Sequence, residues 1–588
     1  MDSKHVTEST SGQEDIQKTW WKEAIIYQIY PRSFQDSDGD GIGDLNGITS
    51  RLDYIQSLGV DIIWLNPIFL SPNDDNGYDI SDYREIMREF GTMEDFDRLL
   101  KEIHKREMRL VLDLVVNHTS DEHPWFEEAR KSRHNPYYNY YHWWPAEKGE
   151  PPLRLSYFDE EGNAWMYNKS TDSYYLHYFS RKQPDLNWEN PEVRQEIFDM
   201  MRFWFDKEID GFRMDSISLI AKDPSFPLID SKKYPDIFSF YAKEPRLHLY
   251  LHEMNRQVLS IYDCMSVGEG SAVMVDDVAK FVDPAREELN MLYHFDAARI
   301  RNTTLPDNPE SGIDYSLIAL KKMFTEWDKA VDKGWPSIYL GNHDQPRMVS
   351  RFGSDKDEFR ALSAKMLITF LLTMRGTPYW FAGDEIGMRN IRFDRIEDYN
   401  DIDTINRYKK AKAEGKDPQA VLDEQKETGR DNARTPFQWD RSPEAGFTAG
   451  TPWLKVNPDY TWINVADEEK DPTSILNYFK KVVSFRKENP SLIYGSYHLL
   501  DAENPQCYIF LRKTGADTYL IMLNFSPKAA ISTPGIDMSN AHVLLDNYGD
   551  RSHMAPQKDI TLRPFEAIVF QLNHPVYESF IDSLDLLE

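Results

Sequence analysis

Three short segments, far apart in the sequence, each place a carboxylate at the end of a predicted β-strand. They are residues 210–215 (DGFRMD), 265–269 (MSVGE) and 340–344 (LGNHD). One acid alone does little chemistry, but two carboxyl groups brought together can split a glycosidic bond, because one attacks the sugar and the other protonates the leaving oxygen. A third acid with a neighbouring histidine can orient the sugar. Acidic residues also end many strands of α/β proteins without doing chemistry, so the prediction depends on the elements that position them.

Eight short apolar segments are predicted strands, and a helix-like stretch follows most of them. They are rich in Val, Ile, Tyr and Phe and mostly lack polar alternation, which is typical of buried parallel strands. Asn190, Pro191 and Glu192 give the start signal of one helix: an N-cap, a proline at the first position and an acid in the first turn. The predicted strands are residues 24–30, 61–65, 110–116, 211–215, 265–269, 291–295, 337–342 and 378–381.

Eight strand–helix alternations predict an α/β fold, a (β/α)8 TIM barrel, with an open doubly wound sheet as the alternative. A small inserted domain is expected after the third strand, and a helical insertion at about 390–429. Alternating segments at 507–511 and 518–525, with a further strand at 567–572, predict a C-terminal antiparallel β-sandwich domain. The expected divisions are barrel at 1–118, inserted domain B at 119–187, barrel at 188–495 and C-terminal β domain at 496–588.

The carboxyl ends of barrel strands converge on one face, where active sites lie. Asp215 ends the fourth strand, Glu269 ends the fifth, and Asp344 follows the seventh. Asp113 and His118 flank the end of the third strand. We therefore expect these polar groups to point into one mouth.

Arg213 lies two residues before Asp215 and so on the same face of its strand. Its charge should keep Asp215 ionised at neutral pH, as a nucleophile must be. Glu269 needs the opposite, a raised pKa, to donate a proton. Such a shift depends on burial, which the sequence does not show.

Four segments stand out: 113–118 (DLVVNH), 211–215 (GFRMD), 267–269 (VGE) and 342–344 (NHD). They are similar to the four shared motifs of the α-amylase superfamily of retaining glycosidases, and the chain therefore resembles that superfamily. Three more resemble segments of its oligo-1,6-glucosidase and α-glucosidase branch. They are 183–187 (QPDLN), 73–79 (NDDNGYD) and 429–436 (GRDNARTP), and the resemblance runs from about Trp20 to the C-terminus.

The resemblance implies Asp215 as nucleophile, Glu269 as acid/base and Asp344 as the acid that distorts and orients the sugar. It implies two pocket-wall positions, Phe179 and Gln183. It also implies a set of residues that grip the non-reducing glucose: Asp75, Tyr78, His118, Arg213, His343 and Arg430.

A separate acidic loop, residues 36–44 (DSDGDGIGD), copies the start of a calcium loop. The expected ligands are Asp36, Asp38, Asp40, the carbonyl of Ile42 and Asp44. The Glu expected at position 12 of such a loop is replaced by Gly47, so a polar Asp/Gly turn without metal is the alternative. The resemblance implies a structural Ca²⁺ here.

Two departures from the family pattern bear on specificity. The residue after the predicted nucleophile is Ser216. In the branch that the chain resembles, Val at this position goes with a preference for α-1,6 bonds and Thr or Ala with a preference for α-1,4 bonds, so Ser matches neither. Arg299 matches the Arg-x-Asp-Arg pattern of sucrose isomerases, but Arg301 and Asn302 break it. Hydrolysis is therefore expected, with a sucrose-isomerising or glucosyl-transferring enzyme as the alternative.

The composition narrows the class of partner. A net charge of −30 repels nucleic acid and anionic lipid and favours a neutral substrate. Two cysteines, Cys264 and Cys507, imply no disulfide framework and suit a reducing compartment. Residues 1–18 lack an apolar stretch and no run of 18 apolar residues occurs, so neither a secretory signal nor a transmembrane helix is expected.

These observations together predict a cytoplasmic, retaining, exo-acting α-glucosidase that acts on isomalto-oligosaccharides, maltose or sucrose. The oligomeric state stays open between monomer and dimer. A non-catalytic relative, similar to the heavy chains of amino-acid transporters, would have a membrane anchor and would lack the three acids. This chain keeps Asp215, Glu269 and Asp344.

Overall fold

The computed structural model describes residues 18–158, 162–234, 236–303, 314–515, 517–536, 538–552 and 558–572, without the side chains of 301–303. The segment 1–17, for which no secretory signal is predicted, lies outside the described residues, as do the side chains of Arg301 and Asn302. None of the described helices combines the length and the apolar character needed to cross a membrane.

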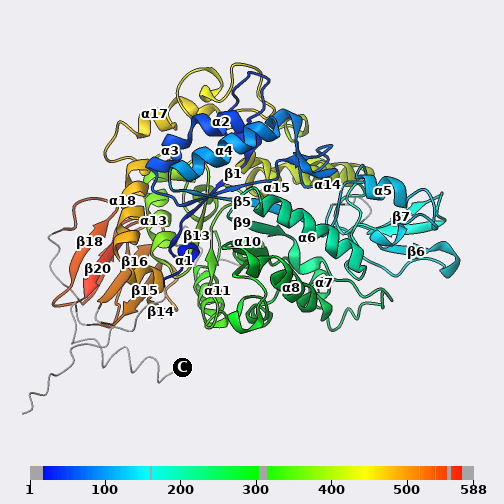
Figure 1. Cartoon of the computed structure of the whole chain (residues 1–588). Helices are drawn as coiled ribbons and strands as arrows, with labels where there is room; N and C mark the ends of the chain where they lie inside the picture. The colour runs from blue at the N-terminus through cyan, green and yellow to red at the C-terminus, as the bar shows by residue number, and fades with distance from the viewer. Residues whose placement is uncertain are drawn as a thin grey trace, which may run out of the picture.

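One parallel sheet of eight strands forms the centre of the molecule (Figure 1). Every predicted strand is confirmed, with ends that differ by a few residues at most. In chain order the strands are β1 (Ile26–Ile29), β2 (Ile62–Leu65), β5 (Arg109–Val115), β9 (Gly211–Asp215), β10 (Met265–Glu269), β11 (Met291–Tyr293), β12 (Ser337–Ile338) and β13 (Thr377–Phe381).

The spatial order of the strands is β11-β10-β9-β5-β2-β1-β13-β12. Each strand lies beside its predecessor and successor among the eight, so the order never reverses as a doubly wound sheet requires. The two ends of the sheet, β11 and β12, contact each other. Side chains bridge this seam: the Ser337 hydroxyl donates to the Leu292 carbonyl at 2.9 Å, and the Tyr339 hydroxyl to the His294 carbonyl at 2.5 Å. The sheet is therefore a TIM barrel.

Helices cover the outside of the barrel because most of them present an apolar stripe to it, whereas α13 (Arg360–Thr373) is buried on nearly all sides. In α6, the predicted N-cap Asn190 accepts a hydrogen bond from the amide of Glu192 at 3.0 Å. The longest covering helices are α4 (Met93–Lys105), α6 (Pro191–Phe205), α8 (Arg246–Gln257), α11 (Leu317–Ala330), α13 (Arg360–Thr373) and α18 (Ile475–Glu488).

Two insertions reach over the barrel mouth. The first contains α5 (Pro124–Ala129) and a three-stranded antiparallel sheet in the order β6 (Trp143–Pro145), β8 (Ser173–Leu176), β7 (Trp165–Asn168). The second follows β13 and contains α14 (Ile402–Ala413) and α15 (Pro418–Thr428). The side-chain amide of Asn406 on α14 donates to the carbonyl of Phe158 at 2.6 Å, so the two insertions touch.

The C-terminal part is a small antiparallel sandwich on the side of the barrel away from β6 and β7 (Figure 1). Residues of both of its sheets, such as Leu520 and Ile560, share one apolar core. The larger sheet runs β14 (Ser496–Leu500), β15 (Cys507–Thr514), β16 (Asp517–Asn524), β20 (Ala567–Leu572), β18 (His542–Asp546), and the smaller pairs β17 (Ala530–Ser532) with β19 (Ile560–Leu562).

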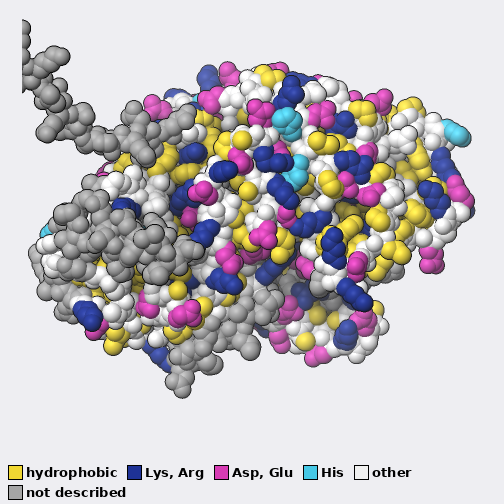
Figure 2. Space-filling model, turned by 90° about the horizontal axis from the view of Figure 1, so that it is seen from below, with side chains coloured by type: hydrophobic (Ala, Val, Ile, Leu, Met, Phe, Trp, Pro, Cys, Tyr) yellow, Lys and Arg dark blue, Asp and Glu magenta, His cyan; other side chains and the backbone are white. Residues whose placement is uncertain are grey.

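Charges of both signs are interspersed over the face drawn in Figure 2. Such a surface suits a neutral ligand better than a polyanion.

A buried arginine of the sandwich caps the carboxyl end of a barrel helix. Arg512 on β15 donates to the carbonyls of Thr373 at the end of α13 (2.6 Å), Leu492 (2.8 Å) and Gly495 (2.7 Å). Helix C-terminal carbonyls have no partner within the helix, and a cation there also suits the helix dipole. This contact ties the sandwich to the barrel.

We expect Arg512→Met to lower the free energy of unfolding by about 3 kcal/mol or more, because buried carbonyls lose a charged donor. Urea unfolding of both proteins measures the difference. Lys513→Met, one position along the same strand and half-buried, is the control and should cost less than about 1 kcal/mol. Equal stability of the two variants would show that the cap contributes nothing.

Candidate active site

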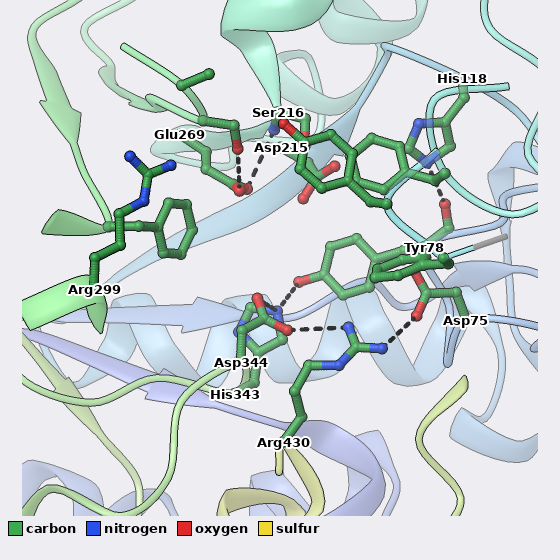
Figure 3. Close-up of a pocket in the computed structure, with 16 residues that line it drawn as sticks. Asp75, Tyr78, His118, Asp215, Ser216, Glu269, Arg299, His343, Asp344 and Arg430 are labelled. Carbon is green, nitrogen blue, oxygen red and sulfur yellow. Dashed lines mark hydrogen bonds and ion pairs between the residues drawn. The ribbon is translucent and has the colours of Figure 1, made fainter. Parts of the chain in front are cut away.

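A cavity of about 260 Å³ lies at the carboxyl ends of the barrel strands (Figure 3). It brings together nine of the eleven predicted catalytic and sugar-binding residues, and also Ser216 and Arg299. Arg213 and Gln183 do not line it; both are completely buried behind its wall. The lining residues are Asp75, Tyr78, His118, Tyr157, Phe158, Phe179, Asp215, Ser216, Glu269, Ser271, Ala272, Phe295, Arg299, His343, Asp344 and Arg430.

One buried guanidinium holds three carboxylates from three neighbouring strands. Arg213 Nη1 donates to Asp113 at 2.7 Å and to Asp215 at 2.8 Å, and its Nη2 donates to Glu269 at 2.5 Å. Its Nε donates to the Tyr293 hydroxyl at 2.8 Å. Asp113 and Arg213 are register partners on β5 and β9, so their side chains emerge on the same face. The barrel register therefore produces this cluster.

The guanidinium of Arg213 holds the carboxyl groups of both Asp215 and Glu269, so the two lie close together. The pKa of Glu269 is raised to about 8 because burial and, to a smaller extent, the negative charge of Asp215 outweigh the opposing charge of Arg213. Burial also raises the pKa of Asp215, to about 6, with Arg213 holding it down. At neutral pH the pair is therefore asymmetric, with Glu269 protonated and Asp215 ionised.

Two further donors orient the carboxyl group of Glu269. The Ser271 hydroxyl donates to its Oε1 at 2.9 Å, and the backbone amide of Ser216 donates to its Oε2 at 3.2 Å. Ser216 adopts a left-handed conformation, with φ of +42°. Non-glycine residues seldom adopt it, and it turns the Ser216 amide toward Glu269.

Asp344 is held by donors on both of its oxygens. His343 contacts its Oδ2 at 3.0 Å, and Arg434 contacts its Oδ1 at 3.0 Å. The amide of Gln28 donates to Nδ1 of His343 at 2.8 Å, which puts the ring proton on Nε2, toward Asp344. Despite burial, the contact with His343 and the charges of Arg430 and Arg434 hold the pKa of Asp344 well below its usual value.

Arg430 closes the cavity on the side opposite Asp215 and Glu269 (Figure 3). Its guanidinium lies 3.4 Å from both Asp75 and Asp344, and 2.5 Å from Asp401 of the second insertion. Gln183 donates to the other oxygen of Asp75 at 3.2 Å. Burial raises the pKa of Asp75 to about 7. Gln183 thus supports Asp75 from behind.

Aromatic rings form much of the remaining wall. Tyr78 lies parallel to His343, with ring centroids 5.3 Å apart, and its hydroxyl donates to Asp113 at 2.9 Å. Phe179 stacks on Tyr157 at 5.1 Å and lies 5.0 Å from the His118 ring. His118 is buried, which lowers its pKa to about 3, so the ring is neutral at pH 7.

A second cavity of about 570 Å³ adjoins the first beneath the second insertion. The two share Phe158, Phe295, Arg299, Asp344 and Arg430. Charged residues of α14 and α15 line it, and they are paired: Arg407 lies 2.6 Å from Glu424. A molecule held in the first cavity could extend into this one.

Several residues at the site were not singled out from the sequence. Arg434 lies within the quoted 429–436 segment, which could have marked it. Tyr157 and Phe158 belong to an irregular loop, and Asp401 lies in none of the quoted motifs. Only the folded contacts distinguish them. The additional residues that line the first cavity or pair with its charges are Tyr157, Phe158, Ser271, Ala272, Phe295, Asp401 and Arg434.

The acidic loop brings carboxylate oxygens of Asp36, Asp38 and Asp40 within 4.8 Å of one another. Among the described residues, no lysine or arginine forms an ion pair with them. Burial raises the pKa of Asp40, and the neighbouring carboxylates raise it further. These features fit a cation.

Asp44 lies outside this acidic cluster, in contrast to the predicted ligand set. Its carboxylate caps α2 (Leu45–Ser50), accepting from the amides of Ser37 and Gly47 at 2.7 Å each. Gly47 replaces the expected Glu because its Cα lies against the carbonyl of Gln35, where an added Cβ would lie 1.9 Å from the oxygen.

Comparisons with known proteins agree with this geometry. The profile described as alpha amylase, catalytic domain, matches residues 28–495. An oligo-1,6-glucosidase of Parageobacillus thermoglucosidasius is 51% identical over 571 residues, which cover 95% of this chain and 100% of the relative. The oligo-1,6-glucosidase of Bacillus cereus is 49% identical over 567 residues, covering 95% of this chain and 100% of that protein.

Among solved structures, the isomaltulose synthase SmuA from Protaminobacter rubrum superposes with a TM-score of 0.89 and 42% identity, covering 95% of this chain and 100% of that one. A mutant of the trehalulose synthase MutB in complex with the substrate sucrose superposes with a TM-score of 0.89 and 42% identity. The match covers 94% of this chain and 99% of that one.

The raised pKa of Glu269 predicts a pH-dependent gain in stability for Glu269→Gln. The folded-state pKa lies above the unfolded value, so the carboxyl contributes stability below pH 4.5 that is lost as the pH rises through about 8. The amide carries no charge at any pH, and Arg213 keeps Asp113 and Asp215 as partners. We expect the variant to exceed the parent by about 3 kcal/mol at pH 9 and to match it near pH 4.

Thermal unfolding of both proteins at the two pH values tests this expectation. Glu85→Gln, at an exposed position of β4 (Asp82–Ile86), is the control and should show no such pH-dependent gain. A Glu269→Gln protein that is no more stable than the parent at pH 9 would contradict the raised pKa.

Proposed function

Because the chain belongs to the alpha-amylase family, we propose that it is a retaining, exo-acting α-glucosidase of the oligo-1,6-glucosidase type. It releases terminal non-reducing glucose from short α-glucosides such as isomalto-oligosaccharides, maltose or sucrose. The observation that carries the proposal is that Asp215 and Glu269 both contact one buried guanidinium, with Glu269 the weaker acid.

In the first half of the reaction, a carboxylate oxygen of Asp215 attacks the anomeric carbon. Glu269 transfers its proton to the glycosidic oxygen as the bond from carbon to that oxygen breaks, and the leaving sugar departs as an alcohol. Both carboxyl groups accept from the same guanidinium, and this closeness supports attack by Asp215 itself, since inverting enzymes hold their carboxyls about 6.5–9.5 Å apart to admit a water.

In the second half, Glu269 acts as a base. It takes a proton from water while the water oxygen bonds to the anomeric carbon and the ester bond to Asp215 breaks. Free glucose with retained configuration leaves. Asp215 is then a carboxylate again, and the negative charge beside Glu269 restores its raised pKa.

The far wall of the cavity supports recognition of a chain end. Asp75, Asp344 and Arg430 hold fixed acceptors and donors there, joined by ion pairs of 3.4 Å. Charged hydrogen bonds of this kind suit the terminal hydroxyls that only a non-reducing end presents. A longer chain would have to pass through these buried charges and leave them unpaired, which a site rejects strongly.

The second cavity is the proposed place of the leaving sugar, because it adjoins the first along Phe158, Phe295 and Arg299, which line both. Its arginines are engaged with carboxylates, such as Arg407 with Glu424. Burial, together with the charge of Asp401, raises the pKa of Asp403 to about 6. A neutral sugar therefore fits better than a phosphorylated one.

Sucrose isomerisation is the alternative function. It is favoured by the likeness to MutB and SmuA and by Arg299, which lines both cavities. The higher identity to oligo-1,6-glucosidases favours hydrolysis.

We further propose that Asp36, Asp38 and Asp40 hold a structural Ca²⁺. Bound there, the ion would neutralise the mutual repulsion of the three carboxylates and order the loop without taking part in the chemistry. A reducing cytoplasmic location is proposed from the two cysteines, both of which are free thiols.

Incubation with isomaltose, maltose, sucrose and a cyclodextrin tests the proposed function. We expect single glucose units with retained configuration from the first three, glucose plus fructose from sucrose, and at least a thousandfold slower attack on the cyclodextrin, which has no free end. Asp215→Asn, prepared in parallel, should lose activity by several orders of magnitude and so excludes a contaminating glucosidase. Isomaltulose or trehalulose as the main product would replace hydrolysis with isomerisation.

Removal of Ca²⁺ should lower the melting temperature by several degrees, since an ion bound only to the folded state stabilises it. Scanning calorimetry with excess Ca²⁺ and with a chelator measures the shift. In the Asp38→Asn, Asp40→Asn double variant the chelator should have no effect. An identical chelator response in the variant would place the metal elsewhere.

A further inference from the structure

Ser271 contacts the one oxygen of Glu269 that Arg213 does not. Its hydroxyl donates to Oε1 at 2.9 Å, whereas Arg213 and the amide of Ser216 both donate to Oε2. Ser271 also lines the cavity, so its hydroxyl lies where the leaving oxygen is protonated in the proposed reaction.

We propose that Ser271 is a positioning residue for the acid/base Glu269, and that its hydroxyl stays bound to Oε1 in both halves of the reaction. The inference rests on the proposed glucosidase function and deepens it. It assigns a role to a residue that none of the sequence motifs contains.

The arrangement of donors decides which oxygen carries the catalytic proton. Oε2 of Glu269 accepts from a guanidinium and a backbone amide, and a proton placed there would compete with both. The proton therefore resides on Oε1. A hydroxyl can both donate and accept, so Ser271 can donate to Oε1 in the carboxylate and can remain bonded when Oε1 is protonated.

The backbone holds Ser271 in place. The Ser218 hydroxyl donates to its carbonyl at 2.6 Å, and the amide of Gly270 donates to the carbonyl of Tyr293 at 2.8 Å. Gly270 leaves no room for a side chain, since an added Cβ would lie 2.9 Å from that same carbonyl oxygen. Ala272 has a positive φ of 61°, which turns the chain back directly after the serine. The hydroxyl is thus presented by a fixed turn.

Loss of this hydroxyl should have two effects. The hydroxyl bonds more strongly to the carboxylate than to the neutral carboxyl group, so removing it raises the pKa of Glu269. The basic limb of kcat/KM reports the protonated acid of the free enzyme, and it should move to higher pH. The unsupported carboxyl also delivers its proton less well, which matters only where the leaving group needs protonation.

The test compares Ser271→Ala with the parent on two substrates, isomaltose and 4-nitrophenyl α-glucoside. For isomaltose we expect kcat/KM to fall about tenfold and its basic limb to rise by about one pH unit. For the aryl glucoside, whose leaving group departs without a proton, kcat/KM should change less than about twofold. Ser271→Thr keeps a hydroxyl and should restore both the rate and the limb.

Ser218→Ala is the control, because it should loosen the turn that holds Ser271 without removing the Ser271 hydroxyl. It removes the bond to the Ser271 carbonyl and leaves the contact with Glu269. It should lower the melting temperature while the basic limb stays in place. In a Glu269→Gln background, Ser271→Ala should cause no further loss on isomaltose, because the carboxyl through which it acts is gone.

Equal losses on both substrates with an unmoved basic limb would overturn the inference and leave Ser271 a structural residue. So would an unchanged Ser271→Ala enzyme. These outcomes leave the glucosidase function intact, because the parent still hydrolyses isomaltose. A parent enzyme that hydrolyses neither substrate would overturn the proposed function, and this inference with it.

Discussion

A single buried guanidinium is the interaction on which the rest of the site depends. Arg213 is completely buried and contacts Asp113, Asp215 and Glu269, which come from three adjacent strands. One positive charge cannot neutralise three carboxylates, so the cluster is stable only if some of them stay protonated. Burial is the largest cause of the high pKa of Glu269, and the negative charges of Asp215 and Asp344 add to it.

The three acids at the barrel mouth, Asp215, Glu269 and Asp344, differ in pKa. Glu269 has one cationic contact and a negative neighbour, and its pKa is raised to about 8. Asp344 is more exposed and receives donors from His343, Arg430 and Arg434, which hold its pKa low. Burial and charge balance together decide which carboxyl holds a proton at neutral pH. Paired carboxyls with separated strengths are what acid–base chemistry at neutral pH requires.

The elements outside the barrel act on the site through a few polar links. Arg430 reaches the cavity because Asp401 of the second insertion holds its guanidinium, and Asn406 of the same insertion binds Phe158 of the first. Closure of the mouth is therefore a joint property of two insertions that are far apart in the chain. On the opposite side, Arg512 anchors the sandwich to the end of α13 and so supports the barrel.

The sequence by itself determined the barrel and most of the site. Eight apolar segments predicted eight parallel strands, because strands buried on both faces consist of continuous apolar residues. Motifs at the strand ends predicted that Asp215, Glu269 and Asp344 lie at one barrel mouth. The helical insertion and the sandwich were also predicted, since their periodicities are local. The Asp36, Asp38 and Asp40 cluster followed from its spacing alone.

Only the tertiary structure decided the contacts between segments distant in sequence. It placed Gln183 and Arg213 behind the wall rather than on it, and made Asp44 a helix cap outside the acidic cluster. It brought Tyr157, Phe158, Asp401 and Ser271 to the site although no motif marks them. The pKa of Glu269 was also decided by the tertiary structure. Desolvation and charge balance depend on every neighbour in space, and the spacing of residues along the chain does not determine those neighbours.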